Sequence, residues 1–447
     1  MMTRMTRKLT VVLISVVAVI ALVGACRSGK PLVLRVAHIY EPLSGPVQEA
    51  CLKWLESIAA QFTKAHPAFR VQFEQIQWDK IDSKCMNDYR AGIGHDVVMS
   101  SPQLMPQHFE CGDLLDLMPF LKSWPKTAIE DFAWAPSWAI CARDNVHLGI
   151  PTGVHTRVVI FRRDYFEQAG LDPEKPPTDL DSILAAAKKL TRDTDGDGRP
   201  DVWGLGLYLG PERATIELYF APLLWHFGGD LYDAKTSRAI FASEAGVRAA
   251  EWLRDCIQVH KVTPPWAASG RYDNVIYERF MRGELAMAWG WGNYWNEDLE
   301  KKGWTKGLFP PKPDGQAVKV GAFVTPTRTG AQFTNCWTIS IHKLSAHPAE
   351  AFAFIETMLE PANLDNYADA SLPARRSMWE RAQYATPWFR TWRRAAEMGR
   401  PMPATANYNN LADSVAVALQ EIINKQADPA KTLQRYQDEF NRRYAKP

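Results

Sequence analysis

Residues 32–76 read LVLRVAHIYEPLSGPVQEACLKWLESIAAQFTKAHPAFRVQFEQI, and this stretch decides the fold class. It opens with the apolar run Leu32–Ala37, whose β-branched members predict a strand. Over Glu49–His66 the apolar residues recur at helical spacing, and Pro67 directly after them is a helix stop. Val71–Ile76 then predicts a second strand. A strand, a long helix and a strand in this order are typical of a parallel α/β sheet.

The same alternation continues along the chain. Asp96–Met99 predicts a third, buried strand, and Trp337–Ile341 predicts a late one. At ~100–200 residues per domain, the 447 residues are enough for two or three domains. Further helices are expected over Pro348–Leu359 and after the capping residues Thr178, Ser243 and Asp428.

The charge of the chain is nearly balanced. Lys and Arg number 52 against 50 Asp and Glu, a formal net charge of +2, which gives no electrostatic reason to expect nucleic acid as a partner. Tryptophan is the unusual residue, because 17 of them are more than a core of this size needs. Some of these rings are therefore expected to line a surface or a cleft.

The first residues have the pattern of an export signal. Met1–Lys8 is basic, and the apolar run Leu9–Val23 is shorter than the ~20 residues that span a bilayer. The run ends in Gly24-Ala25-Cys26, which resembles the lipobox of bacterial lipoproteins. We therefore expect a signal peptide over residues 1–25, a lipid on Cys26, a tether over residues 26–32 and a location on the outer side of a bacterial membrane. A plain secretory signal with an incidental cysteine is the alternative.

Six further cysteines follow, and no two of them form a C-x-x-C motif. This spacing argues against zinc-ribbon and thioredoxin proteins. Disulfides are allowed in an exported protein, and four of the six cysteines fall within residues 51–141, so one or two bridges are expected there. Buried thiols are the alternative. The six are Cys51, Cys85, Cys111, Cys141, Cys256 and Cys336.

Several short motifs follow one another along the chain. They include Asp96-Val97-Val98, Gly149-Ile150-Pro151, Phe161–Leu171 (FRRDYFEQAGL), Gly283–Met287 (GELAM) and Leu372–Arg375 (LPAR). In this order they resemble the family 1 extracellular solute-binding proteins of bacterial ABC importers, the group that contains the maltose- and oligosaccharide-binding proteins. The resemblance runs from about residue 33 to the C-terminus, and it departs from the family pattern at His95, where proline is usual.

The resemblance implies a two-lobed α/β fold of the type II periplasmic-binding-protein class, in which each lobe is a mostly parallel sheet flanked by helices and a hinge joins the lobes. Lobe 1 would comprise residues 33–150 and 337–376, lobe 2 residues 151–336 and 400–447, and residues 377–399 would cross between them. A ligand would close the lobes, and the permease subunits of an ABC transporter would recognise the closed form. The resemblance also implies a monomer.

One aromatic segment is the strongest candidate for a sugar site. A sugar offers hydroxyls and a weakly apolar face, so its site needs flat rings and planar polar groups. Trp289–Trp295 (WGWGNYW) alternates such groups with glycine, which predicts a loop that presents rings. We expect Trp291, Asn293 and Trp295 to contact ligand and Trp289 to belong to the core. Burial of all these rings in the core is the alternative.

Further candidates follow predicted strands or match places where relatives contact ligand. For each of them a purely structural role is about as well supported by the sequence. Arg375 would donate to hydroxyls of the ligand, and the Trp225 ring would stack on the ligand. The remaining candidates are Tyr40, Glu41, Trp78, Asp79, Ser100, Ser101, His155, Asn407 and Tyr408.

One acidic run resembles a calcium loop. Asp193, Asp195, Asp197 and Asp201 occupy positions 1, 3, 5 and 9 of an EF-hand pattern, and Gly198 stands at position 6. Position 12 is Gly204, so the bidentate glutamate is missing. A structural Ca²⁺ is one expectation and an acidic surface turn is the other. No other cofactor is expected.

Together these features predict a protein that binds a neutral sugar or oligosaccharide and performs no chemistry on it. The candidate positions hold mostly aromatic and neutral polar residues, whereas a phosphate ligand would need clustered Arg or Lys. The same fold with a glycerol phosphoester or a polyamine as ligand stays open. An exported glycoside hydrolase, which needs two carboxylates, is a further alternative. No H-E-x-x-H, G-x-S-x-G or P-loop motif is present.

Overall fold

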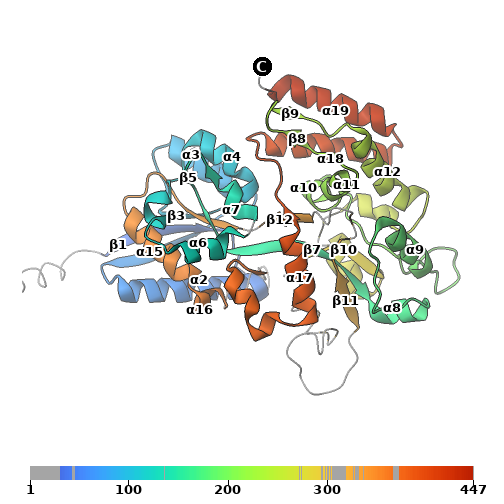
Figure 1. Ribbon diagram of the computed structural model, residues 1–447, viewed down its shortest axis with the longest axis horizontal. Coiled ribbons are helices and arrows are strands. Elements are labelled where there is room, and N and C mark those ends of the chain that lie inside the picture. Colours follow the sequence, from blue (N-terminus) through green and yellow to red (C-terminus); the bar gives the residue numbers. More distant parts are fainter. Residues whose placement is uncertain are drawn as a thin grey trace, which may run out of the picture.

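The computed structural model describes residues 31–42, 46–134, 136–270, 272, 274–292, 295, 296, 299, 302, 304, 319–325, 327, 332–335, 337–365 and 372–445. The predicted signal peptide and Cys26 lie outside the described residues, as do Asn293 and Cys336. Two groups of helices and strands stand side by side in Figure 1, and strands β7 and β12 run between them.

The first group is built on a five-stranded sheet in the order β2-β1-β3-β13-β6. Strands β1 (Leu32–His38), β2 (Phe69–Gln75) and β3 (Val97–Ser100) are parallel, as the sequence predicted. Two strands that arrive later in the chain, β13 (Thr338–Ile341) and β6 (Ile150–Pro151), complete the sheet by antiparallel pairing.

Helices cover this sheet with apolar stripes. Helix α2 (Pro46–Ala65) spans the predicted helical segment and buries Leu55, Ile58 and Phe62 at helical spacing. It packs against α15 (Pro348–Leu359), whose Phe354 lies edge-on to Phe62 at 5.6 Å. Helix α3 (Ile81–Arg90) follows β2 and packs on β3. The residues of this group form a core of their own.

The second group is organised around the long strand β7 (Gly153–Arg162). Strands β10 (Met287–Gly292), β11 (Val320–Phe323), β12 (Gln332–Asn335) and β14 (Leu372–Pro373) all pair with it in antiparallel orientation. Among the residues of this group that the structure describes, parallel pairing is limited to β12 with β15 (Gly399–Arg400) and to two isolated bridges. A mostly parallel sheet was expected in each lobe, and it holds for β1–β3 but not for the partners of β7. These partners come from separate later segments of the chain rather than from successive βαβ units.

The helix caps agree with the sequence in two cases of three. Ser243 caps α12 (Glu244–Gln258), and Asp428 caps α19 (Pro429–Tyr444) by accepting from Lys431 N at 2.8 Å. The expected cap at Thr178 is wrong by one residue. Asp179 caps α9 (Leu180–Leu190), because its carboxylate and the Ser182 hydroxyl form a reciprocal capping box.

Other helices of the second group are α8 (Arg163–Gln168), α10 (Arg213–Thr215), the π-helix η2 (Ile216–Phe220), α11 (Ala221–His226), α13 (Arg279–Arg282), α17 (Pro387–Glu397) and α18 (Tyr408–Asn424). The first group also contains α4 (Met105–Cys111), α5 (Met118–Leu121), α6 (Lys126–Ala133), α7 (Pro136–Ile140) and α16 (Pro361–Leu364). Short strands β4 (Ala142–Arg143), β5 (Val146–His147), β8 (Tyr232–Asp233) and β9 (Arg238–Ala239) form two small hairpins.

The chain passes between the two sheets at two points near each other. It leaves the first sheet after Pro151 and enters the second at Gly153, and it returns between Asn335 and Thr338. The two crossings are bonded to each other, because both the amide and the hydroxyl of Thr152 donate to Trp337 O, at 2.9 and 3.0 Å. The segment 377–399 places Trp388 and Trp392 in the core of the second group.

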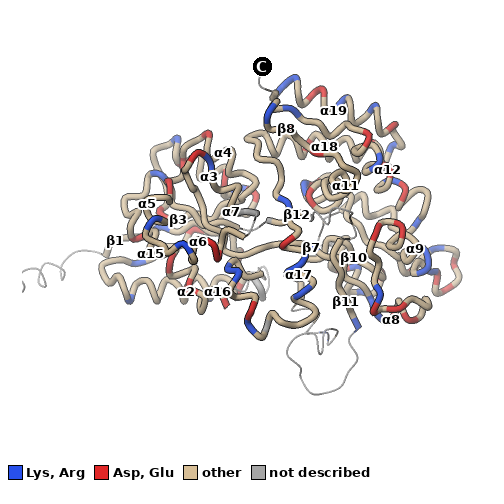
Figure 2. Tube along the Cα trace, viewed as in Figure 1, with Lys and Arg blue, Asp and Glu red and all other residues tan. Residues whose placement is uncertain are grey.

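The disulfide prediction is wrong for the cysteines that the structure describes. Cys51, Cys85, Cys111, Cys141 and Cys256 are all reduced, and four of them are buried. Burial therefore accounts for these thiols without a bridge. Within the described part of the chain, no helix combines the length and the apolarity needed to cross a bilayer. Acidic and basic residues are interspersed over both groups of elements (Figure 2).

Candidate functional site

A cluster of polar side chains lies where the two groups of elements meet. Arg213, at the start of α10, bonds through Nε to Glu217 Oε1 at 3.0 Å. The Tyr408 hydroxyl, at the start of α18, donates to the same carboxylate oxygen at 2.7 Å. From the first group, the Trp78 ring faces Arg213, with 5.7 Å between the guanidinium carbon and the ring centroid. This cation–π contact connects two segments 135 positions apart.

The local backbone explains how Arg213 and Glu217 come together. They lie four residues apart at the junction of α10 with the π-helix η2, so both side chains emerge on the same face. π-Helical turns are rare and occur frequently at functional sites. Glu217 is 7% exposed, whereas half of the Trp78 ring surface remains accessible. The Arg213–Glu217 pair therefore forms the buried side of the contact, and Trp78 leaves one accessible ring.

Burial and neighbouring charges set the protonation of this cluster. Burial raises the pKa of Glu217, and the charge of Arg213 and the Tyr408 hydroxyl oppose that rise. Burial favours a lower pKa for Arg213, but the charges of Glu217 and Asp82 outweigh it, so the pKa is raised. Burial and the Glu217 charge raise the pKa of Tyr408 well above its usual value. Tyr408 thus stays a neutral donor.

Asp82 connects the cluster to the end of strand β3. Its Oδ1 accepts from the Ser101 amide and from His108 Nε2, both at 3.0 Å. Asp82 is buried, and its charge also acts on Arg213 of the other group. The strand end at Ser101 is therefore held by a carboxylate that faces the second lobe.

Strand β7 brings two further groups to the same region. Burial first, and then the charge of Arg157, lower the pKa of His155 to about 3. Arg157 also acts electrostatically on Glu217. The imidazole of His155 is therefore neutral, and its ring nitrogens suit hydroxyl groups rather than anions.

Of the residues predicted from sequence, Trp78, Ser101, His155 and Tyr408 are connected through this cluster. Asp79 lies next to Trp78 and pairs with Lys80 at 3.0 Å, and Asn407 directly precedes α18. Sequence reasoning missed Asp82, Arg157, Arg213 and Glu217. The i, i+4 spacing of Arg213 and Glu217 was visible, but the same spacing is common on solvated helix faces.

The expectation of a ring-presenting loop over Trp289–Trp295 is wrong. Met287–Gly292 is strand β10, and the pairing with β7 shifts register between Trp289 and Trp291. Gly290 adopts φ +96° at this bulge, a conformation that favours glycine. Trp291 is completely buried and lies 5.1 Å from Phe280, while Trp295 packs on Tyr277 at 5.2 Å. Ligand contact by Trp291 and Trp295 stays a prediction, as it does for Asn293.

Several other candidates serve contacts within one lobe. The Ser100 hydroxyl bonds to Thr338 and Ser340 at 2.9 and 3.0 Å inside the first sheet. Trp225 donates to Asp230 at 3.2 Å, and Arg375 donates to Leu359 O at 2.9 Å. Tyr40 is buried and stacks on His38, and the Glu41 amide donates to Gln48. Their roles toward a ligand stay predictions.

The acidic loop brings three carboxylates together at the surface. Oxygens of Asp193, Asp195 and Asp197 lie within 4.8 Å of one another, and all three residues are exposed. Asp193 accepts from the amides of Gly196 and Gly198 at 2.6 and 2.7 Å, which lowers its pKa. Asp201 instead accepts from Thr194. Three of the four predicted ligands are thus grouped.

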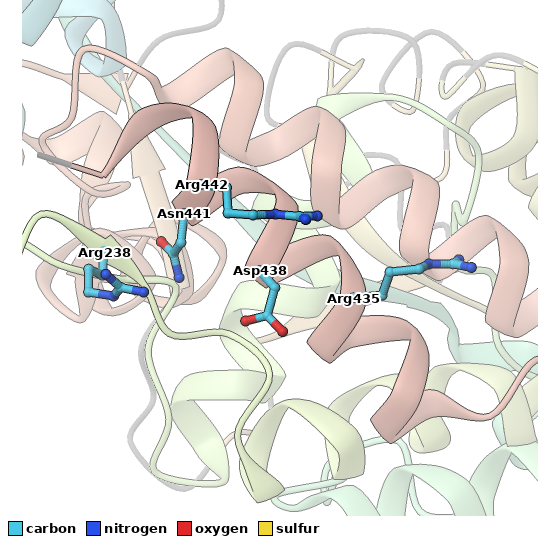
Figure 3. Close-up of a pocket in the computed structure, with 5 residues that line it drawn as sticks. All are labelled: Arg238, Arg435, Asp438, Asn441 and Arg442. Carbon is cyan, nitrogen blue, oxygen red and sulfur yellow. The ribbon is translucent and has the colours of Figure 1, made fainter.

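A hollow of about 530 Å³ lies between β9 and α19, and none of the predicted ligand residues lines it. In Figure 3 the side chains of Arg435 and Arg442 extend away from Arg238, so the three cations do not converge on one point. Asn441 there joins β9 to α19 through bonds to Ala239. The hollow is a feature of the outer surface of the second group.

Comparison with known proteins identifies the family. The family model of the bacterial extracellular solute-binding proteins matches residues 45–365, more than half of the chain. The chain belongs to this family. Solved structures agree with the fold of this solute-binding protein. A solute-binding protein of a Thermotoga lettingae ABC transporter, bound to α-D-tagatose, is 21% identical with a TM-score of 0.73, over 93% of this chain and 99% of its own. The sugar-binding protein MalE of Xanthomonas citri is 17% identical with a TM-score of 0.75, over 92% and 96%.

Curated relatives of this solute-binding protein are distant. Proteins of Brucella abortus, provisionally named as binding proteins, are 22% identical over 63% of this chain and 62% of their own length. The match thus spans less than two thirds of these relatives. An uncharacterized lipoprotein of Streptomyces antibioticus is 25% identical over 81% of this chain and 74% of its own. The two-lobed type II fold and the family are established by these findings.

Proposed function

We propose that this chain is the extracytoplasmic binding component of an ABC importer and that it holds a neutral sugar or oligosaccharide between its two lobes. The observation that carries the proposal is the contact of Trp78 with Arg213, because it places an open ring on one lobe opposite a planar donor on the other. A sugar needs both groups, one for its apolar face and one for its hydroxyls.

The charges around this contact favour an uncharged ligand. Arg213 is paired with Glu217, and Asp82 is paired with His108, which also contacts Asp113. His155 is neutral because burial and Arg157 lower its pKa. A phosphoester or a polyamine would leave one sign of charge in excess here. The sugar ligands of the Thermotoga and Xanthomonas proteins support the same ligand class.

A ligand screen tests the proposal. Thermal shift and calorimetry over neutral mono- and oligosaccharides, glycerol phosphoesters and polyamines should give binding only to saccharides. Binding of a phosphoester or a polyamine alone would reject the sugar. The binding-only function predicts no release of reducing ends from any oligosaccharide that binds.

We also propose that Cys26 carries a lipid anchor and that the protein delivers its ligand, as a monomer, to permease subunits. Support comes from the residues 22–26 that resemble a lipobox and from the lipoprotein relative in Streptomyces. Mass spectrometry of membrane-extracted protein should find acylated Cys26 as the N-terminus. An intact Met1 would contradict the anchor.

A structural Ca²⁺ at Asp193, Asp195 and Asp197, with Asp201 bonded beside them, is a further part of the proposal. It is supported by the grouping of three carboxylates and by the lowered pKa of Asp193. We also propose the limits of the two lobes. Lobe 1 comprises residues 33–150 and 337–376, lobe 2 comprises residues 151–336 and 400–447, and residues 377–399 form the crossover. Limited proteolysis tests them, because cuts should fall between the cores.

A further inference from the structure

A second cluster of metal-ligating side chains lies deep inside the first lobe. One ligand atom each of Cys85, His108 and Asp113 falls within 4.8 Å of the other two. Cys85 is 2% exposed, and His108 and Asp113 are completely buried. They come from α3, α4 and the segment after α4, so no short sequence motif contains them.

The three side chains of the cluster contact one another. His108 Nδ1 lies 2.9 and 3.0 Å from the two oxygens of Asp113, and the Cys85 thiol bonds to the same carboxylate. A thiolate, an imidazole and a carboxylate are the ligand types that Zn²⁺ takes, at ~2.0–2.3 Å each. Ligand atoms already so close need only small shifts to surround one ion.

The groups behind these ligands strengthen the case. Metal-bound histidines almost always donate their second ring nitrogen to a carboxylate or carbonyl, which fixes the ring. Here His108 Nε2 faces Asp82 Oδ1 at 3.0 Å, and Asp82 is itself held by the Ser101 amide. A second imidazole, that of His342, reaches the carbonyl oxygen of Cys85 at 3.4 Å.

We propose that Cys85, His108 and Asp113 form a structural Zn²⁺ site, with Asp82 as the outer carboxylate on His108. Zn²⁺ would bind Cys85 as a thiolate and His108 as a neutral imidazole. The ion would rigidify the end of β3 next to Ser101, and the inference does not depend on which solute the protein binds.

Metal content and cobalt spectroscopy of the full chain test the site. Protein purified from cells grown with Zn²⁺ should hold one zinc per chain, and X-ray absorption should show one sulfur among its ligands. Growth with Co²⁺ should replace the zinc and produce the absorption band of a thiolate bound to cobalt. These readouts need no variant, so they remain decisive if a substitution impairs folding.

Matched variants locate the ion. Cys85→Ser should abolish the thiolate band, whereas Cys256→Ser should keep it, because Cys256 is an equally buried thiol in the other lobe. Asp195→Asn, in the exposed acidic loop, should also keep it. Protein without bound zinc, zinc without a sulfur ligand, or a band that survives Cys85→Ser would overturn the proposal.

Discussion

Trp78 and Trp291 show how differently two tryptophans of this chain are used. Trp78 follows a strand of the first lobe, leaves half of its surface accessible and meets a guanidinium of the second lobe. Trp291 lies in a strand of the second lobe, is completely buried and packs on Phe280. The contrast indicates that ring density along the sequence does not locate a site. The proposed site rests instead on an open ring that faces the other lobe.

Removal of the buried ring should give the largest effect. Trp291→Ala should lower the free energy of unfolding by about 3–5 kcal/mol, the usual cost of truncating a buried tryptophan. Trp78→Ala is the control, and it should stay within about 0.5 kcal/mol of wild type, as expected of exposed positions. Urea unfolding measures both. Equal losses in the two variants would remove the distinction between the rings.

The pH dependence of stability tests the burial of His147 in the first lobe. His147 is 3% exposed and its ring centroid lies 4.2 Å from that of Trp138, with the two ring planes tilted by 52°. Burial lowers the pKa of His147 to about 4 despite the opposing charge of Asp116. The unfolded chain binds this proton below about pH 6.5 and the folded chain does not. Stability should therefore fall as the pH drops from 6.5 to 4, by up to about 3 kcal/mol.

The variant His147→Phe isolates that contribution. Its unfolding free energy should depend less on pH over the same interval, by about the amount assigned to His147. Thermal unfolding from pH 7 to pH 4 provides the measurement. An unchanged slope would show that His147 stays protonated or that its ring becomes solvated.

Removal of the open ring should affect binding instead of stability. Trp78→Ala should weaken saccharide binding about tenfold, equivalent to about 1.4 kcal/mol, because one stacking surface is lost. Trp78→Phe should restore part of the affinity. Calorimetry with the saccharide found in the screen measures both. Wild-type affinity in Trp78→Ala, together with loss of affinity in Trp295→Phe, would move the site to the aromatic cluster around β10.

The exposed acidic loop should give the smallest effect. Ca²⁺ at about five times its Kd should raise the stability of chelator-treated protein by about 1 kcal/mol, and Asp197→Asn should lose this gain. Saccharide affinity should be the same with and without Ca²⁺, because the loop is not among the residues around Trp78 and Arg213. Differential scanning calorimetry checks the shift, and no response to Ca²⁺ would leave the loop as a turn.

Periodicity and capping residues predicted most of the fold. The strand–helix–strand segment at residues 32–76 appears as expected, and Ser243 and Asp428 cap their helices. The cap at Asp179 was missed by one residue, because two adjacent side chains are both good caps. The antiparallel pairing around β7 was missed because the relative direction of paired strands depends on segments far apart in the sequence, which leave no local pattern.

The site was predictable only in part, for a physical reason. A residue at the end of a strand, such as Trp78 or Ser101, can be found from the pattern that precedes it. Trp291 could not be placed, because a tryptophan between two glycines gives the same local sequence pattern whether its ring is buried in the core or exposed to a ligand. Arg213 with Trp78, and Cys85 with His108, depend on contacts between distant segments, and those arise only from the folded arrangement.

The two hydrogen bonds from Thr152 to the carbonyl oxygen of Trp337 have a mechanical consequence. They fasten the outgoing and the returning chain at one point, so the two crossings share strain instead of bending separately. A rotation of one lobe must then twist both crossing segments about a common hinge axis. Thr152→Val removes the hydroxyl bond but keeps the amide bond. It therefore changes the stiffness of the pivot and leaves both lobes intact.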